Sequence, residues 1–459
     1  MALHIIILAA GQGKRMHSTM SKVLHPLGGT PMLARVVDAA AALHPEGIHV
    51  VIGHGGEQIR AALPALPVQW VFQAEQLGTG HAVLEALPFI PPNSEVLVLS
   101  ADVPLIQAET LRALILSVST KESSAPLGLL LALVENPTGL GRIVRDAHGH
   151  IRAIVEEKDA SEKERLIREI YTGICCARAE DFLRWLPKLG LNNAQGEYYL
   201  TEIIAMAVAE NKPIHSLQAI DPLTVQGVNN RVQLAQLERA WQARLAVHLM
   251  EAGVTLADPA RLDIRGELQC EQDVFIDVNV VLSGKVVIRS GCQIGPNCTL
   301  TNVTLGENCT IKSHSVLEGC VIGDTCEIGP FARIRPGTVL AARCKIGNFV
   351  ETKNAVFDED SKASHLSYLG DVTIGKDVNI GAGSITCNYD GANKHQTVIE
   401  DGVFIGSDTQ LVAPVTVGKN ATIGAGSTIR TSVPAGELTL TASKQKTVYG
   451  WVRPQKKKK

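Results

Sequence analysis

The sequence is poor in aromatic residues, nearly balanced in charge and without long apolar runs. Lys and Arg number 43 and Asp and Glu 46, a formal net charge of −3, so the clustered basic excess of a nucleic-acid-binding protein is absent. No apolar stretch reaches the roughly 18 residues of a membrane span. No basic segment precedes the first aliphatic run, so no signal peptide is predicted. We expect a cytoplasmic protein that binds no nucleic acid and spans no membrane.

The composition also bounds the class of protein. Aromatic residues make up only 4 % of the chain, whereas hydrophobic residues make up 45 % and charged residues 19 %, which argues against disorder. A length of 459 residues suggests two or three domains, at about 150 residues each. The 10 cysteines include no Cys-x-x-Cys pair, so a metal site of that kind is not predicted.

The N-terminal half alternates between predicted strands and helices. Short, nearly continuous aliphatic runs occupy residues 4–8, 49–52 and 96–99, the pattern of strands buried on both faces of a parallel sheet. Helical segments at residues 32–43 and 81–87 lie between such runs. This alternation predicts an α/β domain with a doubly wound, Rossmann-like sheet.

The second half follows a period of six residues. Six aliphatic residues in succession are spaced by six positions, and shorter runs with the same step precede them. A glycine often follows, as in Ile294-Gly295 and Ile405-Gly406. Such hexapeptide repeats predict a parallel β-helix, in which each short strand contributes one aliphatic side chain to a shared axial core. The longest run is Ile399, Ile405, Leu411, Val417, Ile423 and Ile429.

The period is interrupted twice, between Ile346 and Ile374 and between Ile380 and Ile399. Insertions in a solenoid form surface loops that often carry its binding residues. We therefore expect loops at both interruptions. These stretches contain the candidate binding residues His365, Tyr368, Asn388, Tyr389 and Lys394.

Six cysteines share one phase of the repeat, two positions before an aliphatic residue, where a hexapeptide repeat places a small inward side chain. We predict that they are small core residues, neither disulfides nor metal ligands. A narrow aliphatic core would also account for the low aromatic content. These residues are Cys292, Cys298, Cys309, Cys320, Cys326 and Cys344.

A glycine-rich turn follows the first predicted strand. Small residues at 9–11 and 13 let backbone N–H groups approach a phosphate, and a following helix would add positive charge. The turn is not a P-loop, because Arg15 stands where Ser or Thr belongs. It is not a dinucleotide fingerprint either, because Met16 replaces the third glycine. Alone, the turn is equally consistent with a tight turn that binds nothing.

Charged residues favour the phosphate interpretation. Arg15 and Lys22 supply positive charge close to the turn. Asp102 follows an apolar strand, at the edge where open α/β sheets bind ligands. Its carboxylate can hold Mg2+ against phosphate oxygens, or it can cap a helix. The occurrence of all these elements in order favours a nucleotide site.

Ordered motifs resemble those of sugar-nucleotide pyrophosphorylases: LAAGxGxRM, KVLH, QAEQLGTGHA, DVPL, PTGxGRI, NNAQGEYYLT and GVNNR. With the hexapeptide repeats, the chain resembles the bacterial bifunctional UDP-N-acetylglucosamine pyrophosphorylase / glucosamine-1-phosphate N-acetyltransferase family from Ile5 to about Trp451. This resemblance implies two reactions. Glucosamine 1-phosphate is acetylated by acetyl-CoA, and UTP then transfers uridylyl to the N-acetylglucosamine 1-phosphate and releases pyrophosphate. The product is a precursor of peptidoglycan and lipopolysaccharide.

For uridylyl transfer, the resemblance implies Mg2+ bound by Asp102 and Asn229, with Arg15 and Lys22 neutralising the phosphates. Gln73, Gly78 and Thr79 would read the uracil. Residues implied to contact the amino sugar include Gly141 and Glu156. The full set implied to bind UTP or UDP-N-acetylglucosamine is Leu8, Ala9, Ala10, Gly11, Lys22, Gln73, Gly78, Thr79, Ser100, Ala101, Asp102, Gly141, Glu156, Tyr171 and Asn229.

For acetyl transfer, a neutral amine must attack a thioester, and histidine is suited to act as the general base near neutral pH. Among the 14 histidines, the resemblance selects His365. It implies a glucosamine-1-phosphate site of Arg335, Lys353, Tyr368 and Asn379. It implies an acetyl-CoA site of Ala382, Asn388, Tyr389, Ser407, Ala425 and Lys444.

The chain departs from the family pattern at three positions. Tyr171 stands where the family has an Asn that contacts the sugar, and Ala101 stands where it has Gly. Lys444 lies in the segment where the family uses an Arg for the CoA phosphate. The lysines at 456–459 are predicted to form a solvated tail.

The predicted organisation is a pyrophosphorylase domain at 1–231, a linker helix at 232–252 and a left-handed β-helix acetyltransferase domain at 253–459. The linker belongs to a stretch at 229–251 that contains no glycine or proline. The resemblance also implies a homotrimer formed through the β-helix. Two alternatives remain: a related pyrophosphorylase for another base or sugar, or a non-catalytic regulatory homologue. Retention of Lys22, Asp102, Asn229 and His365 argues against the second.

Overall fold

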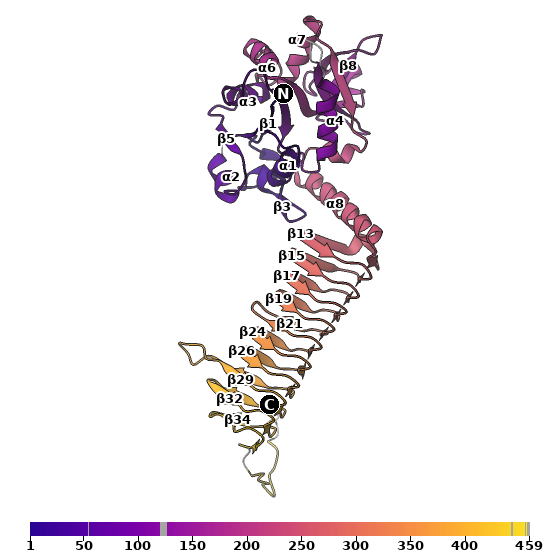
Figure 1. Ribbon diagram of the computed structural model, residues 1–459. Coiled ribbons are helices and arrows are strands. Elements are labelled where there is room, and N and C mark those ends of the chain that lie inside the picture. Colours follow the sequence, from indigo (N-terminus) through magenta and orange to yellow (C-terminus); the bar gives the residue numbers. More distant parts are fainter. Residues whose placement is uncertain (54, 120–125, 442–443, 455, 457–459) are drawn as a thin grey trace. The chain divides into compact units, whose positions relative to one another are not determined.

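The computed structural model describes residues 1–53, 55–119, 126–441, 444–454 and 456. The chain forms two compact units, Met1–Trp241 and Gln242–Lys459, called here the N-terminal unit and the β-helix unit (Figure 1). Within the described part of the chain, no helix is both long and apolar enough to cross a membrane.

The N-terminal unit is built on a nine-stranded sheet in which β11, β7, β10, β6, β1, β4 and β5 follow one another. β1 lies between β4 and β6 and runs parallel to both, as the aliphatic runs predict. The strands of this sheet are β1 (Leu3–Leu8), β4 (Gly47–Ile52), β5 (Gln69–Phe72), β6 (Glu95–Ser100), β7 (Leu127–Leu133), β8 (Gly141–Arg145), β9 (Ile151–Val155), β10 (Glu169–Arg178) and β11 (Ile214–Gln218).

The sheet differs from the prediction in one respect, because it is mixed. β10 runs antiparallel to both β6 and β7. The residue pattern of β10 gives no sign of this, since a strand buried on both faces is continuously apolar whichever way its neighbours run. The helices of this unit are α1 (Met32–Ala41), α2 (Gly56–Ala62), α3 (Thr79–Ala86), α4 (Ala108–Val118), α5 (Glu162–Arg165), α6 (Ala179–Trp185) and α7 (Ile203–Ala209).

Both faces of the sheet are buried, each in its own apolar cluster. Ile5 and Ile7 of β1 belong to one cluster, which also contains α1 and α4 residues. Ile6 belongs to the other, with residues of α3, α6 and α7. Successive residues of a strand point to opposite faces, so only an uninterrupted aliphatic run can supply both clusters.

A pair of buried histidines lies at the N-terminal end of β1 and β4. His4 Nδ1 and His49 Nε2 are 3.1 Å apart, and the rings are 7 % and 2 % exposed. Burial, and secondly the neighbouring His4, lower the pKa of His49 to about 4. The pair is therefore neutral in the folded protein near pH 7.

The helix α8 (Arg231–Glu251) falls in the predicted connecting stretch, and the two units divide within it. In the N-terminal unit, the Arg35 guanidinium lies 4.2 Å from the Trp241 ring centre, and Glu238 accepts a hydrogen bond from Gly28 N. In the β-helix unit, Gln242 exchanges two hydrogen bonds with the backbone of Ile264.

The β-helix unit consists of coils whose strands stack in parallel ladders (Figure 1). The first ladder contains β12 (Thr255–Leu256), β14 (Phe275–Ile276), β16 (Gln293–Ile294), β18 (Thr310–Ile311), β20 (Glu327–Ile328), β23 (Lys345–Asn348), β25 (Lys362–His365), β27 (Asn379–Ile380), β30 (Phe404–Ile405), β33 (Thr422–Ile423) and β35 (Leu438–Thr439). The second contains β13 (Leu262–Cys270), β15 (Val280–Ile288), β17 (Thr299–Leu305), β19 (Val316–Ile322), β21 (Arg333–Ile334), β24 (Glu351–Phe357), β26 (Tyr368–Ile374), β28 (Ile385–Cys387), β31 (Gln410–Val412) and β34 (Thr428–Ile429), and β22 (Val339–Leu340), β29 (Thr397–Ile399) and β32 (Val415–Val417) pair beside it.

The repeat aliphatics form one continuous core, as predicted. Ile405, Val417 and Ile423 are fully buried, and the other members of the longest run are at most 3 % exposed. Each coil therefore buries its aliphatic residues against the coils before and after it, which is why a single coil would not be stable alone.

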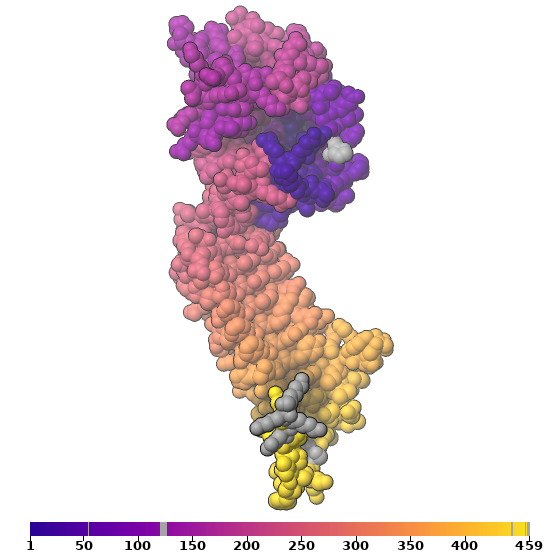
Figure 2. Space-filling view, turned by 180° about the vertical axis from the view of Figure 1, so that it is seen from behind, coloured from indigo at the N-terminus to yellow at the C-terminus, as the bar shows by residue number. Residues whose placement is uncertain are grey.

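The first predicted interruption is wrong. Between Ile346 and Ile374 the coils continue without a loop, with Thr352 and Ala363 in the inward positions and in register with Ile334 and Ile346. Threonine and alanine at these inward positions do not match the aliphatic repeat. The sequence pattern is therefore interrupted here, although the coils are not. The second interruption is a real loop at residues 388–396, between β28 and β29, and it projects from the coils (Figure 2).

The cysteine prediction is confirmed. All six repeat cysteines are buried and none forms a disulfide. Five of them donate Sγ–H hydrogen bonds to backbone carbonyls, for example from Cys309 to Gly323 O at 3.0 Å, and four of these five stand at the same place in consecutive coils. Ser361 takes the same place in the next coil and donates to Gly375 O. These four residues are Cys292, Cys309, Cys326 and Cys344.

Candidate functional site

A pocket of about 570 Å3 opens at the carboxyl ends of β1 and β6 in the N-terminal unit. Carboxyl ends of parallel strands meet at one edge of a sheet, so the turns that follow β1 and β6 converge there. Predicted residues that line this pocket are Leu8, Ala9, Ala10, Gly11, Arg15, Lys22, Gln73, Gly78, Thr79, Ser100, Asp102 and Asn229. Ala101 lies behind the wall and is fully buried.

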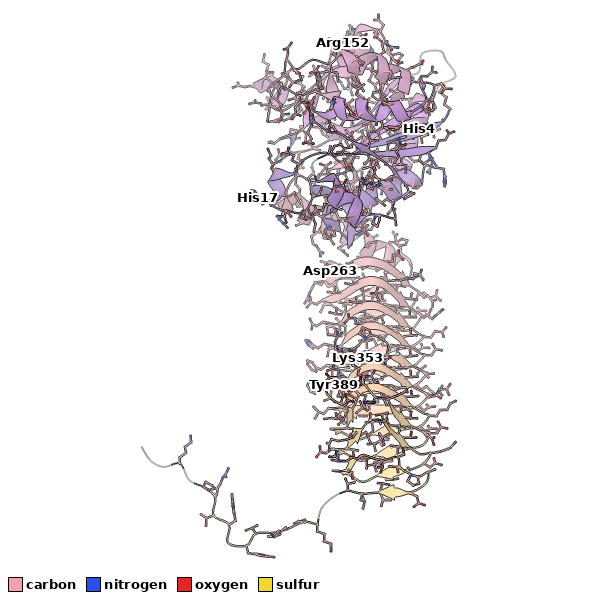
Figure 3. All side chains as sticks on the ribbon, turned by 90° about the vertical axis from the view of Figure 1, so that its left-hand side faces the viewer. His4, His17, Arg152, Asp263, Lys353 and Tyr389 are labelled. Carbon is pink, nitrogen blue, oxygen red and sulfur yellow. The ribbon has the colours of Figure 1, made fainter. Side chains whose placement is uncertain are left out.

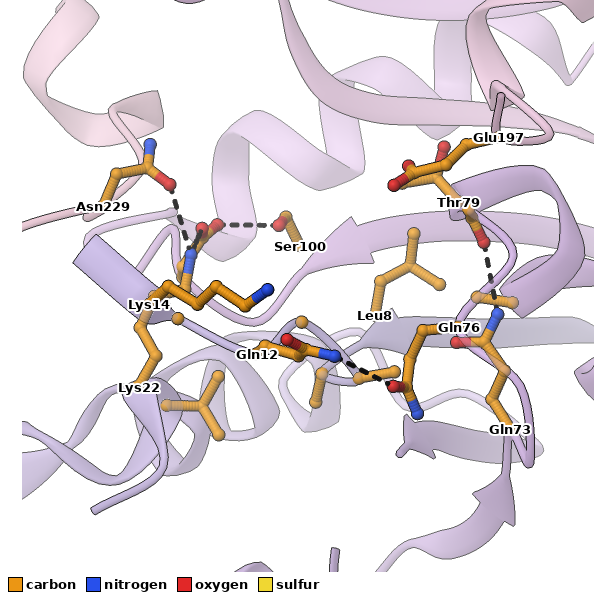
Figure 4. Close-up of a pocket in the computed structure, with 18 of the residues that line it drawn as sticks. Leu8, Gln12, Lys14, Lys22, Gln73, Gln76, Thr79, Ser100, Glu197 and Asn229 are labelled. Carbon is orange, nitrogen blue, oxygen red and sulfur yellow. Dashed lines mark hydrogen bonds and ion pairs between the residues drawn. The ribbon is translucent and has the colours of Figure 1, made fainter. Parts of the chain in front are cut away.

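The charged end of the pocket is a hydrogen-bonded cluster (Figure 4). Lys22 Nζ donates to Asp102 Oδ2 and, at 3.3 Å, to Asn229 Oδ1. Arg15 also donates to Asn229 Oδ1, at 3.0 Å, and Ser100 Oγ donates to the second Asp102 oxygen at 2.7 Å. Residues separated by more than 200 positions therefore converge on one point. The backbone bond from Val228 N to Asp102 O, at 2.8 Å, brings the two segments together.

The same cluster fits a divalent cation. A carboxylate oxygen of Asp102 and an amide oxygen of Asn229 both face one cationic atom, Lys22 Nζ. Mg2+ prefers such oxygen ligands and usually takes only one or two from protein, with water and phosphate oxygens completing its shell. Among the described residues, no group of three or more His, Cys, Asp or Glu could hold a metal, so a cage made of protein alone is absent.

The opposite end of the pocket presents amide and hydroxyl groups. Gln73 Nε2 donates to Gly78 O at 3.2 Å and lies 2.9 Å from His81 Nδ1. Thr79 Oγ1 accepts from Leu200 N at 3.0 Å. Gly78 has φ +116°, and a Cβ there would come within 2.8 Å of the Tyr198 backbone, so only glycine fits. Apart from the Glu197 carboxylate beside Thr79 (Figure 4), this end offers uncharged hydrogen-bonding groups, which suit recognition of a base.

Three predicted sugar-contacting residues lie outside the pocket lining and form a group of their own. Tyr171 pairs with Gly141 across β10 and β8. A Cβ on Gly141 would lie 3.6 Å from Glu156 Oε1, which accepts a hydrogen bond from Thr201. Burial raises the pKa of Glu156. Tyr171 is 8 % exposed, and its buried hydroxyl has no hydrogen-bond partner among the described residues.

Several pocket residues were not predicted. Lys14 adds a cation beside the glycine-rich turn, and Glu197 adds a carboxylate. Glu197 is a fixed residue of the motif NNAQGEYYLT, which could have nominated it, whereas Lys14 occupies a variable position of LAAGxGxRM. The unpredicted lining residues are Gln12, Gly13, Lys14, Val23, Gln76, Ala82, Gln195 and Glu197.

In the β-helix unit, four predicted residues occupy one repeated position. It lies two residues after the inward residue of the first ladder and is called the corner position. Those inward residues, Ala363, Ile380, Ile405 and Ile423, are in register from coil to coil. His365, Ala382, Ser407 and Ala425 are therefore stacked along one edge of the β-helix.

Glycines make this edge flat. Gly381 and Gly406 stand just before Ala382 and Ser407. A Cβ on Gly406 would lie 2.5 Å from Ala425 N, and one on Gly381 would lie 2.6 Å from Ser407 N. No side chain fits there, so these glycines let successive coils pack closely at this edge.

His365 has a partner that the sequence did not predict. Its Nδ1 lies 2.7 Å from Asn348 Oδ1, and Asn348 occupies the corner position of the preceding coil. Ser367 Oγ donates to His365 O at 2.9 Å. His365 itself is exposed on strand β25, not on a loop.

A cluster of cations lies on the second ladder. Arg335 and Lys353 are neighbours, because Ile334 is in register with Thr352. The pKa of Lys353 is lowered, first by Lys394 on the 388–396 loop and then by Arg335. Glu351 accepts a hydrogen bond from Arg335 at 2.7 Å. Lys394 was noted as a candidate but not assigned to the phosphate site. Figure 3 labels Lys353, which lies on the coils, and Tyr389, which lies on the 388–396 loop.

Tyr368 and Asn388 meet above Gly370. A Cβ on Gly370 would lie 2.4 Å from the Tyr368 hydroxyl and 2.9 Å from Asn388 Nδ2. Asn388 also donates to Asp371 at 2.5 Å. Tyr389 lies on the loop, 60 % exposed, with its hydroxyl bonded to Gly391 O.

Two predicted residues lie apart from these contacts. Asn379 is half-buried on β27, in register with Lys362. Lys444 is exposed in the C-terminal segment. Of the predicted solvated tail, positions 457–459 lie outside the described residues.

Each match to a known protein family falls within one of the two units. The MobA-like NTP transferase domain matches residues 5–139, and the GMPPB C-terminal domain matches 264–357. The hexapeptide repeat of succinyl-transferase matches 371–392, and the bacterial transferase hexapeptide (six repeats) matches 396–431. The first unit is thus a Rossmann-like nucleotidyltransferase domain, and the second is a left-handed parallel β-helix.

Full-length relatives are named bifunctional protein GlmU. The protein of Legionella pneumophila (strain Lens) is 65 % identical over 100 % of both chains. That of Marinobacter nauticus is 54 % identical over 99 % of both, and that of Pseudomonas entomophila is 54 % identical over 100 % of both. The chain therefore belongs to the bifunctional GlmU family, the UDP-N-acetylglucosamine pyrophosphorylase and glucosamine-1-phosphate N-acetyltransferase family that its motifs resemble.

Proposed function

We propose that residues 1–231 carry the uridylyltransferase, that 253–459 carry the acetyltransferase, and that 232–252 link them. The observation that carries this proposal is the existence of two separate clusters of motif residues, one in each unit. One combines a pocket of about 570 Å3, lined by the cations Arg15 and Lys22, with two oxygen ligands, Asp102 and Asn229. The other aligns His365 with the corner residues Ala382, Ser407 and Ala425, which are stacked in register. Relatives named bifunctional support the assignment of one activity to each.

In uridylyl transfer, the phosphate of N-acetylglucosamine 1-phosphate attacks the α-phosphorus of UTP, and pyrophosphate leaves. Such reactions need positioning and charge neutralisation more than covalent chemistry from the protein. Arg15 and Lys22 would neutralise the phosphates, and Gln73 and Thr79 would orient the uracil. Asp102 and Asn229 would hold Mg2+, which supplies further neutralisation of phosphate charge.

Sugar binding is assigned to the group outside the pocket lining. Glu156, whose pKa is raised by burial, and Gly141 would contact the amino sugar. Tyr171 would replace the family Asn on the same wall, where its hydroxyl has no hydrogen-bond partner within the described part of the chain. Ser100 and Ala101 would complete the nucleotide site.

In acetyl transfer, the amine of glucosamine 1-phosphate attacks the thioester carbonyl of acetyl-CoA. His365 accepts the amine proton, the carbon–sulfur bond breaks, and CoA leaves as the thiolate. Arg335 and Lys353, with Lys394, would bind the sugar phosphate, and the mutual repulsion of these cations favours an anion between them. Tyr368 and Asn379 would orient the sugar.

Acetyl-CoA is assigned to the edge beyond His365. Ala382, Ser407 and Ala425 would offer backbone groups along it, and Asn388 and Tyr389 would close it from the 388–396 loop. Lys444 would take the place of the family Arg at the CoA phosphate. These roles are supported by the stacking of the corner positions in register.

We also propose a cytoplasmic homotrimer that forms through the β-helix. An exposed apolar strip supports an interface there: Phe331 and Phe349 are 47 % and 55 % exposed and stack at 5.3 Å. Leu366 continues the strip at 61 % exposure. Analytical ultracentrifugation of the full chain tests this assembly, and a monomer at micromolar concentration would contradict it.

The direct test is incubation of the purified chain with glucosamine 1-phosphate, acetyl-CoA, UTP and Mg2+. We expect UDP-N-acetylglucosamine, CoA and pyrophosphate, measured by mass spectrometry. Without acetyl-CoA, product should form only when the acetylated sugar phosphate is supplied. Product formed equally well from another nucleoside triphosphate would favour a pyrophosphorylase of different specificity, and no product at all would favour a non-catalytic homologue.

A further inference from the structure

The hydrogen bond between Asn348 and His365 links two neighbouring coils at one point of the edge. Asn348 Oδ1 and His365 Nδ1 are 2.7 Å apart, and the two residues are directly opposite in the parallel pairing of β23 and β25. Leu366 N donates to Asn348 O at 3.0 Å, so backbone and side chain of Asn348 both hold the segment that carries His365.

Asparagine is unusual at the corner position. The register of the first ladder places Ser313 and Pro330 there in the two preceding coils, and Ala382 in the coil after His365. Proline and alanine have no side-chain hydrogen-bonding group, and a serine hydroxyl is one bond shorter than a carboxamide. Asn348 thus supplies an acceptor at the one coil where it can meet the imidazole.

The direction of this bond fixes the tautomer of the imidazole. A carboxamide oxygen can only accept, so His365 Nδ1 must carry the proton. In a neutral imidazole, Nε2 then has a free lone pair. Only that nitrogen can take a proton from an amine, because Nδ1 is already protonated and engaged.

We propose that Asn348 is a positioning residue for acetyl transfer, which holds His365 in the Nδ1–H tautomer with Nε2 directed outward as the base. This inference rests on the proposed acetyltransferase function. Without Asn348, the imidazole would distribute between tautomers and rotamers, and a smaller share would be ready to accept the proton. The substrate sites would be unchanged, because Asn348 is not part of them.

Replacement of Asn348 tests the proposal on the full chain. Asn348→Ala should lower kcat for acetyl transfer by about 10- to 100-fold, the usual cost of losing a partner that orients a histidine. The KM values for glucosamine 1-phosphate and acetyl-CoA should stay within about twofold, as should uridylyl transfer. Ser313→Ala, at the equivalent corner two coils earlier, is the matched control and should leave every rate unchanged.

Asn348→Asp tests the pH profile of acetyl transfer, which should not change if Asn348 has a purely structural role. Aspartate keeps the acceptor, so most of the rate should return. Its negative charge stabilises the imidazolium, so the acid limb of the kcat/KM pH profile should move to higher pH. This variant is nearly isosteric and decides the question if Asn348→Ala does not fold.

The possible outcomes distinguish a failure of this inference from a failure of the proposed acetyltransferase function on which it rests. Normal kcat in Asn348→Ala, or an unmoved pH profile in Asn348→Asp, with His365→Ala inactive, would overturn the role of Asn348 alone. Undiminished acetyl transfer by His365→Ala would overturn the proposed base as well, and Asn348 with it.

Discussion

The two units assemble their sites in different ways. In the N-terminal unit, Lys22, Asp102 and Asn229 come from three segments that share no spacing rule, and a mixed sheet brings them to one edge. In the β-helix unit, Asn348, His365, Ala382 and Ser407 occupy the same position on successive coils. The order of the strands in the sheet brings the residues of the first site together. The register between successive coils brings those of the second site together.

This difference determines how each site tolerates change. A residue at a topological meeting point has several partners in different segments, so its loss disturbs all of them. A residue at a corner position contacts the coils before and after it, so the effect of replacing it should remain local. The predictions below test that contrast, beginning with the largest expected effect.

Removal of the Asp102 carboxylate should have the largest effect. Asp102 accepts hydrogen bonds from Lys22 and Ser100 and is a proposed Mg2+ ligand. We expect Asp102→Ala to lower kcat for uridylyl transfer roughly 100- to 1000-fold, with acetyl transfer unchanged. Asp146→Ala, which alters a carboxylate outside the pocket lining, is the control. Loss of both activities in Asp102→Ala would break the separation of the two sites.

Acid should destabilise the N-terminal unit through its buried histidine pair. The pKa of His49 is about 4 in the folded protein, against about 6.5 for an unperturbed histidine. Between those values the unfolded chain binds a proton that the folded unit does not, so stability falls as pH drops from 6.5 to 4 and changes no further below. The full difference is roughly 3 kcal/mol.

In the β-helix unit, burial raises the pKa of Cys320 to about 12, so this thiol stays protonated over the same pH range. Urea unfolding at pH 7 and 4.5, followed by tryptophan fluorescence, measures the effect, because Trp70, Trp185 and Trp241 lie in the N-terminal unit. His49→Gln should reduce the difference between the two pH values. The exposed control His148→Gln should leave it unchanged, and an equal reduction by both would contradict the assignment.

A methyl group on the flat edge should disturb the β-helix unit alone. In Gly406→Ala the new Cβ would meet backbone atoms of Ile423 and Ala425, which cannot turn aside as a side chain could. We expect a loss of about 1–3 kcal/mol in the stability of this unit, a higher KM for acetyl-CoA and normal uridylyl transfer. Gly190→Ala, where the nearest atom would be 3.9 Å away, is the control. Unchanged acetyl-CoA binding would show that the ligand does not use this edge.

The smallest effect is expected inside the β-helix. Cys309→Ser keeps a donor for Gly323 O, and Ser361 already makes the corresponding bond in a later coil. We expect the free energy of unfolding to change by less than about 1 kcal/mol. Cys309→Ala removes the donor and should cost more. Chemical denaturation of both variants measures the difference, and a larger loss for serine than for alanine would contradict the donor role.

Periodicity made the β-helix largely predictable. The step of six identified the buried aliphatics and the inward cysteines, because every coil repeats the same environment. It failed between Ile346 and Ile374, where Thr352 and Ala363 face inward although neither matches an aliphatic pattern. The period also could not show that Lys394 approaches Lys353, since a loop outside the repeat has no register.

The N-terminal site was predictable only through its motifs. Residues beside the glycine-rich turn line the pocket as expected, because a strand followed by such a turn places them at the sheet edge. The antiparallel β10 and the separate group of Gly141, Glu156 and Tyr171 were not predictable from single residues. Their positions depend on strand pairings between distant segments, which local composition does not encode.

The corner positions also lie at regular intervals along the β-helix. Neighbouring strands in a sheet lie about 4.8 Å apart, so each coil advances the edge by one fixed step. His365 and Ser407 are separated by two such steps, roughly 10 Å. The length of the proposed acyl-donor site along this edge is therefore set in whole coils. Adding one coil between β27 and β30 would lengthen that site by a single step and leave the neighbourhood of His365 intact.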